Sequence, residues 1–223
     1  IPGLIDLHIH GSVGFDVMDG TPEALKNISQ NLIKAGTTAY LATTMTESPS
    51  CIENALRNIA VYKSNPIPEW GAEILGVHLE GPFISPSRMG AQNPEFIQKP
   101  DINLFKKWQD ISGQSIRLVT LAPEVEGALE LIQYLAETGV VASVGHSDAS
   151  FFQTKKSIDH GVTHCTHLYN AMSSFHHRTP GVALAVLEDS RVRAELIADG
   201  IHVDPSIISF TLKTKGASHL VMV

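Results

Sequence analysis

The sequence contains few cysteines and no long apolar run. Its two cysteines, Cys51 and Cys165, lie far apart and match neither a metal-binding nor a redox motif, so we expect two buried, reduced thiols. No run of about 18 apolar residues occurs, so we expect no membrane-spanning helix and no membrane partner. No signal peptide is visible either, and together these observations predict a cytoplasmic protein.

Positive charge is also scarce. The 223 residues include 16 Lys and Arg against 23 Asp and Glu, a formal net charge of -7. Because affinity for a phosphate backbone requires a basic surface, this balance argues against a nucleic-acid partner. It leaves room for a small anionic ligand held by a local cluster of cations. With 43% hydrophobic and 17% charged residues, the composition is typical of an α/β protein with many buried strands.

Apolar strand-like runs alternate eight times with amphipathic helical stretches, at roughly the thirty-residue spacing of a βα unit. Such alternation predicts a parallel sheet with right-handed crossovers, and eight units favour a (β/α)8 TIM barrel over residues 1–223. A doubly wound open sheet is the alternative, but Gly11-Ser12-Val13-Gly14 does not match the glycine-rich phosphate-binding fingerprint. The first expected strand lies within residues 1–11, and the others lie at 37–45, 74–80, 116–121, 140–144, 163–167, 193–197 and 219–223.

The predicted strands end in histidines and one glutamate. His8 and His10 are two residues apart, so both imidazoles point to one face of the first strand. Glu80 ends a buried strand just before Gly-Pro, and His146 and His167 follow two later strands. The carboxyl ends of barrel strands meet at one face, which makes these five residues candidate metal ligands. Each one alone could instead be a polar strand end or a hydrogen-bonded core residue, and the ligand types suit zinc, iron, cobalt or manganese equally.

Several motifs resemble the N-acetylglucosamine-6-phosphate deacetylases of the amidohydrolase superfamily, and the similarity runs from Ile1 to Val223. The motifs are His78-Leu79-Glu80-Gly81-Pro82-Phe83, Gly90-Ala91-Gln92-Asn93-Pro94, Gly145-His146-Ser147, Thr166-His167-Leu168-Tyr169-Asn170-Ala171-Met172, Pro180-Gly181 and Asp199-Gly200-Ile201-His202-Val203. The resemblance implies metal-dependent hydrolysis of the acetamide of N-acetylglucosamine 6-phosphate, in amino-sugar catabolism.

The resemblance also implies a role for individual residues. Glu80, His146 and His167 match the principal metal ligands, which activate water, and His8 and His10 match a pair found in members that hold two ions. Asn170 and the backbone of Ala171 match groups that bind the substrate phosphate, and His202 matches a histidine that contacts the sugar phosphate. Arg178 matches an arginine that reaches the substrate of a neighbouring subunit, which implies a homodimer. Gln92 stands where some members carry a histidine that polarises the acetyl carbonyl. The residue types themselves also favour a phosphorylated ligand. A small anion needs a local set of cationic side chains, and the sequence offers His176, His177, Arg178 and His202.

The resemblance further implies a proton-carrying Asp directly after the eighth strand, a final helix and a small β domain, and the printed sequence ends at Val223 before any of them. We therefore expect a longer parent protein and, for the 223 residues, an incomplete barrel. A non-catalytic or inactive sugar-phosphate-binding fragment is one alternative. Another amidohydrolase is a second, but such enzymes commonly recruit a carboxylated lysine at strand four, and residues 116–124 contain no lysine.

Overall fold

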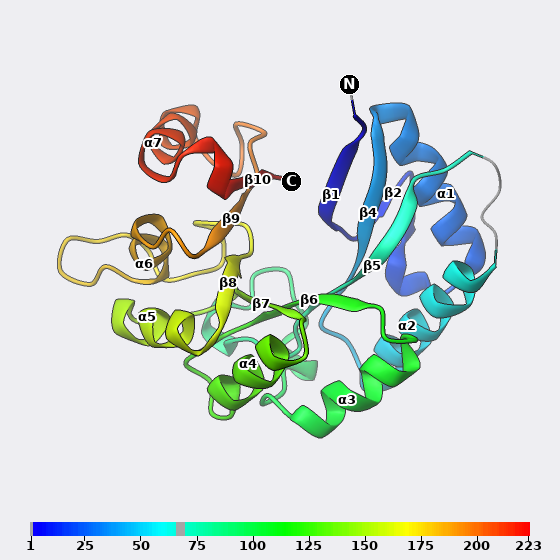
Figure 1. The fold of residues 1–223 in the computed structure, drawn as a ribbon, viewed down its shortest axis with the longest axis horizontal. Helices are drawn as coiled ribbons and strands as arrows, with labels where there is room; N and C mark the ends of the chain where they lie inside the picture. The colour runs from blue at the N-terminus through cyan, green and yellow to red at the C-terminus, as the bar shows by residue number, and fades with distance from the viewer. Residues whose placement is uncertain (1, 66–69) are drawn as a thin grey trace. The chain divides into compact units, whose positions relative to one another are not determined.

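The computed structural model describes residues 2–65 and 70–223 (Figure 1). The main strands follow one another in sheet order as β1-β4-β5-β6-β7-β8-β9-β10, and helices α1 to α7 alternate with them along the chain. This is the element order of a (β/α)8 barrel, as the sequence predicts. The chain forms two compact units, residues 1–80 with 103–118 and residues 81–102 with 119–223. The prediction of one domain over residues 1–223 stays a prediction.

The first unit contains the strands that carry the first histidines and Glu80. Its elements are β1 (Leu4–Ile9), β2 (Gly11–Ser12), β3 (Phe15–Asp16), α1 (Pro22–Leu32), β4 (Thr37–Thr44), α2 (Pro49–Ser64), β5 (Glu73–Glu80) and most of α3 (Ile102–Ile111). Strands β1, β4 and β5 pair in parallel, and α1 and α2 pack against each other beside them (Figure 1). The antiparallel hairpin β2–β3 was not predicted from the sequence.

The second unit carries the later histidines. Its elements are α4 (Ala128–Glu137), β7 (Val141–Val144), α5 (Phe151–His160), β8 (Val162–Cys165), α6 (Val182–Glu188), β9 (Arg193–Leu196), α7 (Pro205–Lys215) and β10 (Leu220–Met222). Strands β7, β8, β9 and β10 pair in parallel in that order. Strand β6 (Ile116–Leu121) begins in the first unit and ends in the second.

Helix starts follow the sequence signals. Thr21 caps α1 by accepting a hydrogen bond from the Ala24 amide at 3.2 Å, and Pro22 occupies the first turn, where its missing N–H costs nothing. At α5, Ser150 and Gln153 form a reciprocal capping box. From the second predicted strand onward, the predicted strand bounds are confirmed to within one or two residues, because apolar runs and the residues that break them set the bounds locally.

One cysteine prediction is wrong. Cys165 is fully buried on β8, but Cys51 is exposed in the first turn of α2. The buried residues of α2 are Ile52, Ala55, Leu56, Asn58 and Ile59. Cys51 lies in the first turn at the edge of this stripe, about 100° around the helix from Ile52.

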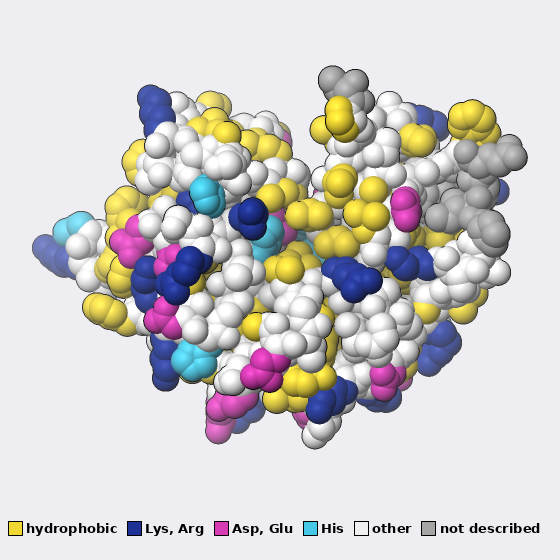
Figure 2. Space-filling view, viewed as in Figure 1, with side chains coloured by type: hydrophobic (Ala, Val, Ile, Leu, Met, Phe, Trp, Pro, Cys, Tyr) yellow, Lys and Arg dark blue, Asp and Glu magenta, His cyan; other side chains and the backbone are white. Residues whose placement is uncertain are grey.

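Charged side chains on the second unit form ion pairs. Asp189 is 5% exposed and accepts hydrogen bonds from Lys155 and Arg191, and Arg191 also contacts Asp159. Figure 2 shows basic and acidic side chains next to one another over the part built from α5 and α6. Among the described residues, no helix is both long and apolar enough to cross a membrane.

Candidate active site

The first unit brings His8, His10 and Glu80 together. The Nε2 atoms of His8 and His10 lie 3.3 Å apart, at 3.4 and 3.1 Å from the two carboxylate oxygens of Glu80. Glu80 is only 2% exposed, so its charge needs a positive partner. One ligand atom from each residue lies within 4.8 Å of the others. Two imidazole nitrogens and one carboxylate within this radius are a donor set that zinc and similar divalent ions accept.

A hydrogen bond at Nδ1 sets the tautomer of His10. The Nδ1 atom of His10 lies 3.3 Å from the main-chain oxygen of Thr43 on β4. A carbonyl oxygen can only accept, so Nδ1 must carry the hydrogen, and in the neutral ring Nε2 then presents a lone pair toward Glu80 and His8. Lone pairs and a carboxylate facing one another favour a cation among them, which is the arrangement that metal-binding histidines adopt.

The second unit brings His146 and His167 together in the same way. Their Nε2 atoms lie 3.1 Å apart, and the residues are 4% and 8% exposed. Each Nδ1 atom faces a main-chain oxygen, that of Arg88 at 3.0 Å for His146 and that of Asn170 at 3.1 Å for His167. With both Nδ1 atoms protonated, two neutral rings would point lone pairs at each other, so this pair also favours a bound cation.

The turn that carries His146 depends on close packing. His146 has a φ of 47°, in the left-handed region that non-glycine residues rarely adopt. Gly145 precedes it, and a Cβ there would lie 2.7 Å from Thr120 Cγ2 and 2.9 Å from Thr166 Cβ. Only glycine allows the β6, β7 and β8 chains to come this close, so the Gly-His-Ser motif has a steric reason as well as a chemical one.

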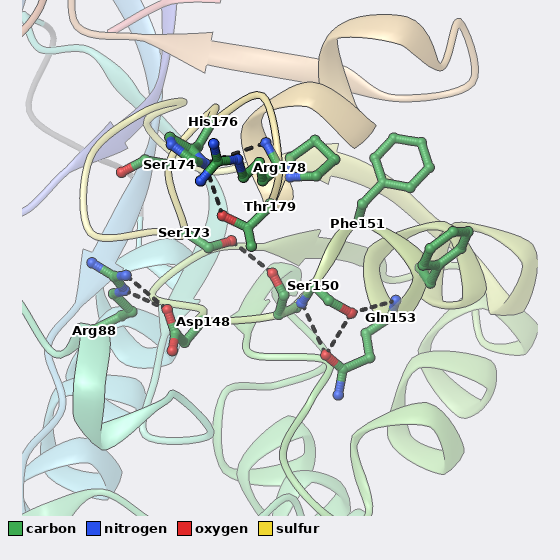
Figure 3. A pocket seen from close by; sticks show the side chains of 14 residues that line it. Arg88, Asp148, Ser150, Phe151, Gln153, Ser173, Ser174, His176, Arg178 and Thr179 are labelled. Carbon is green, nitrogen blue, oxygen red and sulfur yellow. Dashed lines mark hydrogen bonds and ion pairs between the residues drawn. The ribbon is translucent and has the colours of Figure 1, made fainter.

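Two of the residues expected to bind phosphate, Arg178 and His202, line separate pockets of the second unit. Arg178 and His176 line a pocket of about 760 Å³ that also contains Arg88 and Asp148 (Figure 3). His202 lines a different pocket of about 350 Å³ with Tyr169. The structure therefore places Arg178 beside His176, as the sequence suggests, whereas His202 belongs to another pocket. The partly exposed turn with Asn170 and Ala171 directly follows His167, and Gln92 is buried, at 4% exposed, in the loop after β5.

His202 is held by Asp199. The Asp199 carboxylate accepts hydrogen bonds from the amides of Ile201 and His202 at 2.8 Å and from His202 Nδ1 at 2.7 Å. The His202 side-chain bond and these amides lower the pKa of Asp199 to about 2. The carboxylate thus stays charged at neutral pH and leaves the Nε2 atom of His202 available to a ligand.

Sequence reasoning did not identify two further groups near the candidate ligands. Glu195 is fully buried on β9, where one carboxylate oxygen lies 3.1 Å from His164 Nε2 and the other 3.3 Å from the main-chain nitrogen of His167. Glu124, after β6, accepts from the Ser147 hydroxyl at 2.7 Å. The only sequence signal for Glu124 is its place after Ala-Pro at a strand end, the same kind of place that indicated Glu80.

Comparison with known proteins supports a single family. The amidohydrolase family model matches residues 1–222. An N-acetylglucosamine-6-phosphate deacetylase of Bacillus subtilis (strain 168) is 46% identical over 224 residues, covering 100% of this chain and 57% of that protein. An N-acetylgalactosamine-6-phosphate deacetylase of Escherichia coli O157:H7 is 40% identical, covering 93% of this chain and 55% of that protein.

A solved structure gives the same result. The N-acetyl-D-glucosamine-6-phosphate deacetylase D267A mutant from Mycobacterium smegmatis, in complex with N-acetyl-D-glucosamine-6-phosphate, superposes with a TM-score of 0.92 at 36% identity. The match covers 100% of this chain and 57% of that one, so the chain spans little more than half the length of these relatives. The resemblance deduced from the sequence motifs is confirmed, and the chain belongs to the amidohydrolase family.

Proposed function

We propose that the protein containing this chain is a metal-dependent deacetylase that hydrolyses the acetamide of N-acetylglucosamine 6-phosphate to glucosamine 6-phosphate and acetate. The observation that carries the proposal is the pairing of imidazole Nε2 atoms, once beside Glu80 and once between His146 and His167. The named relatives and the complex of the Mycobacterium smegmatis relative with the sugar phosphate support the choice of substrate.

Two groups of residues would hold the metal. In the first unit the donors are His8, His10 and Glu80, and in the second they are His146 and His167. One or two divalent ions, Zn, Fe, Co or Mn, suit nitrogen and carboxylate ligands. The resemblance assigns Glu80, His146 and His167 to the principal ion. Such an ion, when bound, supplies a Lewis acid that makes water nucleophilic near neutral pH and polarises an amide carbonyl.

The chain's own residues supply orientation and substrate binding. The main-chain oxygens of Thr43, Arg88 and Asn170 hold the Nδ1 protons of three histidines, which makes each Nε2 the atom that would bind a cation. The amides of the turn at 170–171 and the imidazole of His202 are suited to the phosphate, and Gln92 to the acetyl oxygen. The resemblance assigns the proton for the leaving amine to an Asp.

The finer assignments belong to the same proposal. The partner is a small phosphorylated amino sugar, and the protein works in the cytoplasm as a homodimer in which Arg178 reaches the neighbouring site. Arg178 is exposed on the loop of residues 173–181, which agrees with a contact outside its own chain. Sedimentation or light scattering of the parent protein, with and without Arg178→Ala, tests this arrangement. The variant should stay dimeric and raise KM more than it lowers kcat.

Hydrolysis by the full-length parent protein is the direct test. Metal-loaded protein should release one amine and one acetate per N-acetylglucosamine 6-phosphate, and the unphosphorylated sugar should be a far poorer substrate because it lacks the anion. Metal content should fall in His146→Asn and separately in a His8→Asn/His10→Asn double variant, which distinguishes one ion from two. No metal uptake by the parent protein would contradict the proposal.

The galactosamine epimer is a second candidate substrate, because one relative at 40% identity is named an N-acetylgalactosamine-6-phosphate deacetylase. Comparing kcat/KM for the two epimers under identical metal loading separates them. A binding-only role is the other alternative. It predicts that the sugar phosphate binds to the parent protein with no release of amine, whereas the deacetylase proposal predicts both.

A further inference from the structure

An ion pair joins two loops of the second unit beside His146. The Nε and Nη2 atoms of Arg88 each lie 2.8 Å from Oδ1 of Asp148 (Figure 3). Arg88 belongs to the loop after β5, and Asp148 follows β7. Two guanidinium N–H groups on one carboxylate oxygen are charge-assisted hydrogen bonds, which are shorter and stronger than neutral ones.

The same two loops are joined through the main chain. The Arg88 carbonyl oxygen accepts from His146 Nδ1 at 3.0 Å, and the Ser85 amide donates to the His146 carbonyl at 2.9 Å. One residue, Arg88, therefore holds Asp148 with its side chain and the His146 ring with its backbone. Moving the guanidinium away from Asp148 would release the short helical turn of residues 86–88 that aims this carbonyl.

The backbone of Asp148 is held by a second residue, Glu124. Glu124 accepts from the Asp148 amide at 2.5 Å and from the Ser147 hydroxyl at 2.7 Å. The Glu124 carboxylate thus holds the backbone of the segment after β7, and the Asp148 carboxylate of the same segment binds Arg88. Because Glu124 holds the Asp148 backbone, the ion pair with Asp148 can fix the position of Arg88 and of its carbonyl oxygen.

We propose that Arg88 and Asp148 are positioning residues that hold His146 in the tautomer with the proton on Nδ1, leaving Nε2 as the donor atom. The proposal rests on the proposed function only in taking that Nε2 atom as a metal ligand. The partner of the unused nitrogen fixes the tautomer of a ligating histidine and its orientation, and losing such a partner typically weakens metal binding about 10- to 100-fold.

Stability alone would not explain this arrangement. The side chains of Arg88 and Asp148 are 37% and 47% exposed, and ion pairs of this kind contribute little to folding. The Lys99–Glu126 pair offers a matched control, since it also joins the loop after β5 to another loop of the second unit and is more exposed, at 73% and 82%.

The first experiment reads the tautomer directly in the metal-free parent protein. Histidine labelled with 13C and 15N reports the protonated ring nitrogen by its chemical shifts, at a pH where the ring is neutral. The signals of His146 are those missing from His146→Asn. Arg88→Ala and Asp148→Ala should shift these signals toward a mixture of tautomers, whereas those of His10, held by the main-chain oxygen of Thr43 instead, should not move. Lys99→Ala should leave both unchanged.

The second experiment measures Zn²⁺ affinity by competition with a chromophoric chelator. Each single variant should bind about 10- to 100-fold more weakly than the parent, and Arg88→Ala/Asp148→Ala should be no worse than either, because the two residues act as one unit. Arg88→Lys and Asp148→Asn, which disturb folding least, should show smaller losses in the same direction.

The outcomes separate the two proposals. An unchanged His146 tautomer in Arg88→Ala, Asp148→Ala and the conservative variants overturns the positioning role, whatever happens to metal affinity. Additive losses in the double variant also overturn it. A tautomer that shifts while Zn²⁺ affinity stays constant supports the positioning role and shows instead that His146 is not a metal ligand, which counts against the proposed function.

Discussion

Replacing Glu80 with glutamine should weaken metal binding by about three orders of magnitude. The change keeps the shape of the side chain and removes one negative charge that lies 3.4 Å from His8 Nε2 and 3.1 Å from His10 Nε2. A unit charge about 4 Å from a monovalent cation is worth about 4 kcal/mol at an effective dielectric constant of about 20. For a divalent ion this Coulomb energy doubles. The amide oxygen of glutamine can still bind the ion, so part of the lost energy is regained.

A net loss of about 4 kcal/mol corresponds to roughly a thousandfold increase in Kd, at about 1.4 kcal/mol per factor of ten. Competition with a chelator measures the Kd for Zn²⁺ or Co²⁺, and elemental analysis gives the number of ions bound. Asp189→Asn is the control. It also removes a buried carboxylate, but one that faces Lys155 and Arg191 rather than histidines.

The control should lower the free energy of unfolding and leave metal affinity unchanged. If Glu80→Gln binds Zn²⁺ within about threefold of the parent protein, the carboxylate is not a ligand, and the reasoning from its burial and its histidine contacts fails. If Asp189→Asn weakens binding as much as Glu80→Gln, the loss reflects general destabilisation instead.

Three further predictions concern single side chains. Burial raises the pKa of the Cys165 thiol, so iodoacetamide at pH 8 should label only Cys51 in the native protein and both cysteines after unfolding, as mass spectrometry will show. Lys215→Met should cost about 2–4 kcal/mol in chemical unfolding, because its ammonium donates to two main-chain carbonyls around the end of α6, whereas the same change at exposed Lys213 should cost less than about 0.5 kcal/mol. His202→Ala should raise the pKa of the Asp199 carboxyl from about 2 toward about 3.9 in an NMR titration; since the folded-state pKa is the lower one, the stabilisation is present above about pH 4 and lost as pH falls toward 2.

Local signals explain why the fold could be predicted so completely. The cap at Thr21 and the apolar stripe of α2 each depend on residues within a few positions of one another, so the sequence displays them directly. Strand ends were equally visible, since Glu80 and His146 follow apolar runs and precede residues that break a strand. The hairpin of β2 and β3 was missed because each strand has only two residues, too few to show alternation.

The contacts that orient the candidate ligands could not be predicted, and the reason is chemical. Thr43, Arg88 and Asn170 hold their histidines with main-chain carbonyl oxygens, a group that every residue carries, so no residue type marks these positions. Arg88 does carry a side-chain signal, but its partner Asp148 is 60 residues away, between loops without periodicity. A sequence can thus show which imidazoles are available for a metal. Whether Nδ1 or Nε2 binds the metal depends on where the fold places a carbonyl oxygen. If that is right, substitutions that keep every histidine but move the Arg88 backbone should impair metal binding, and substitutions of the Thr43 side chain that leave its carbonyl in place should not disturb the tautomer of His10.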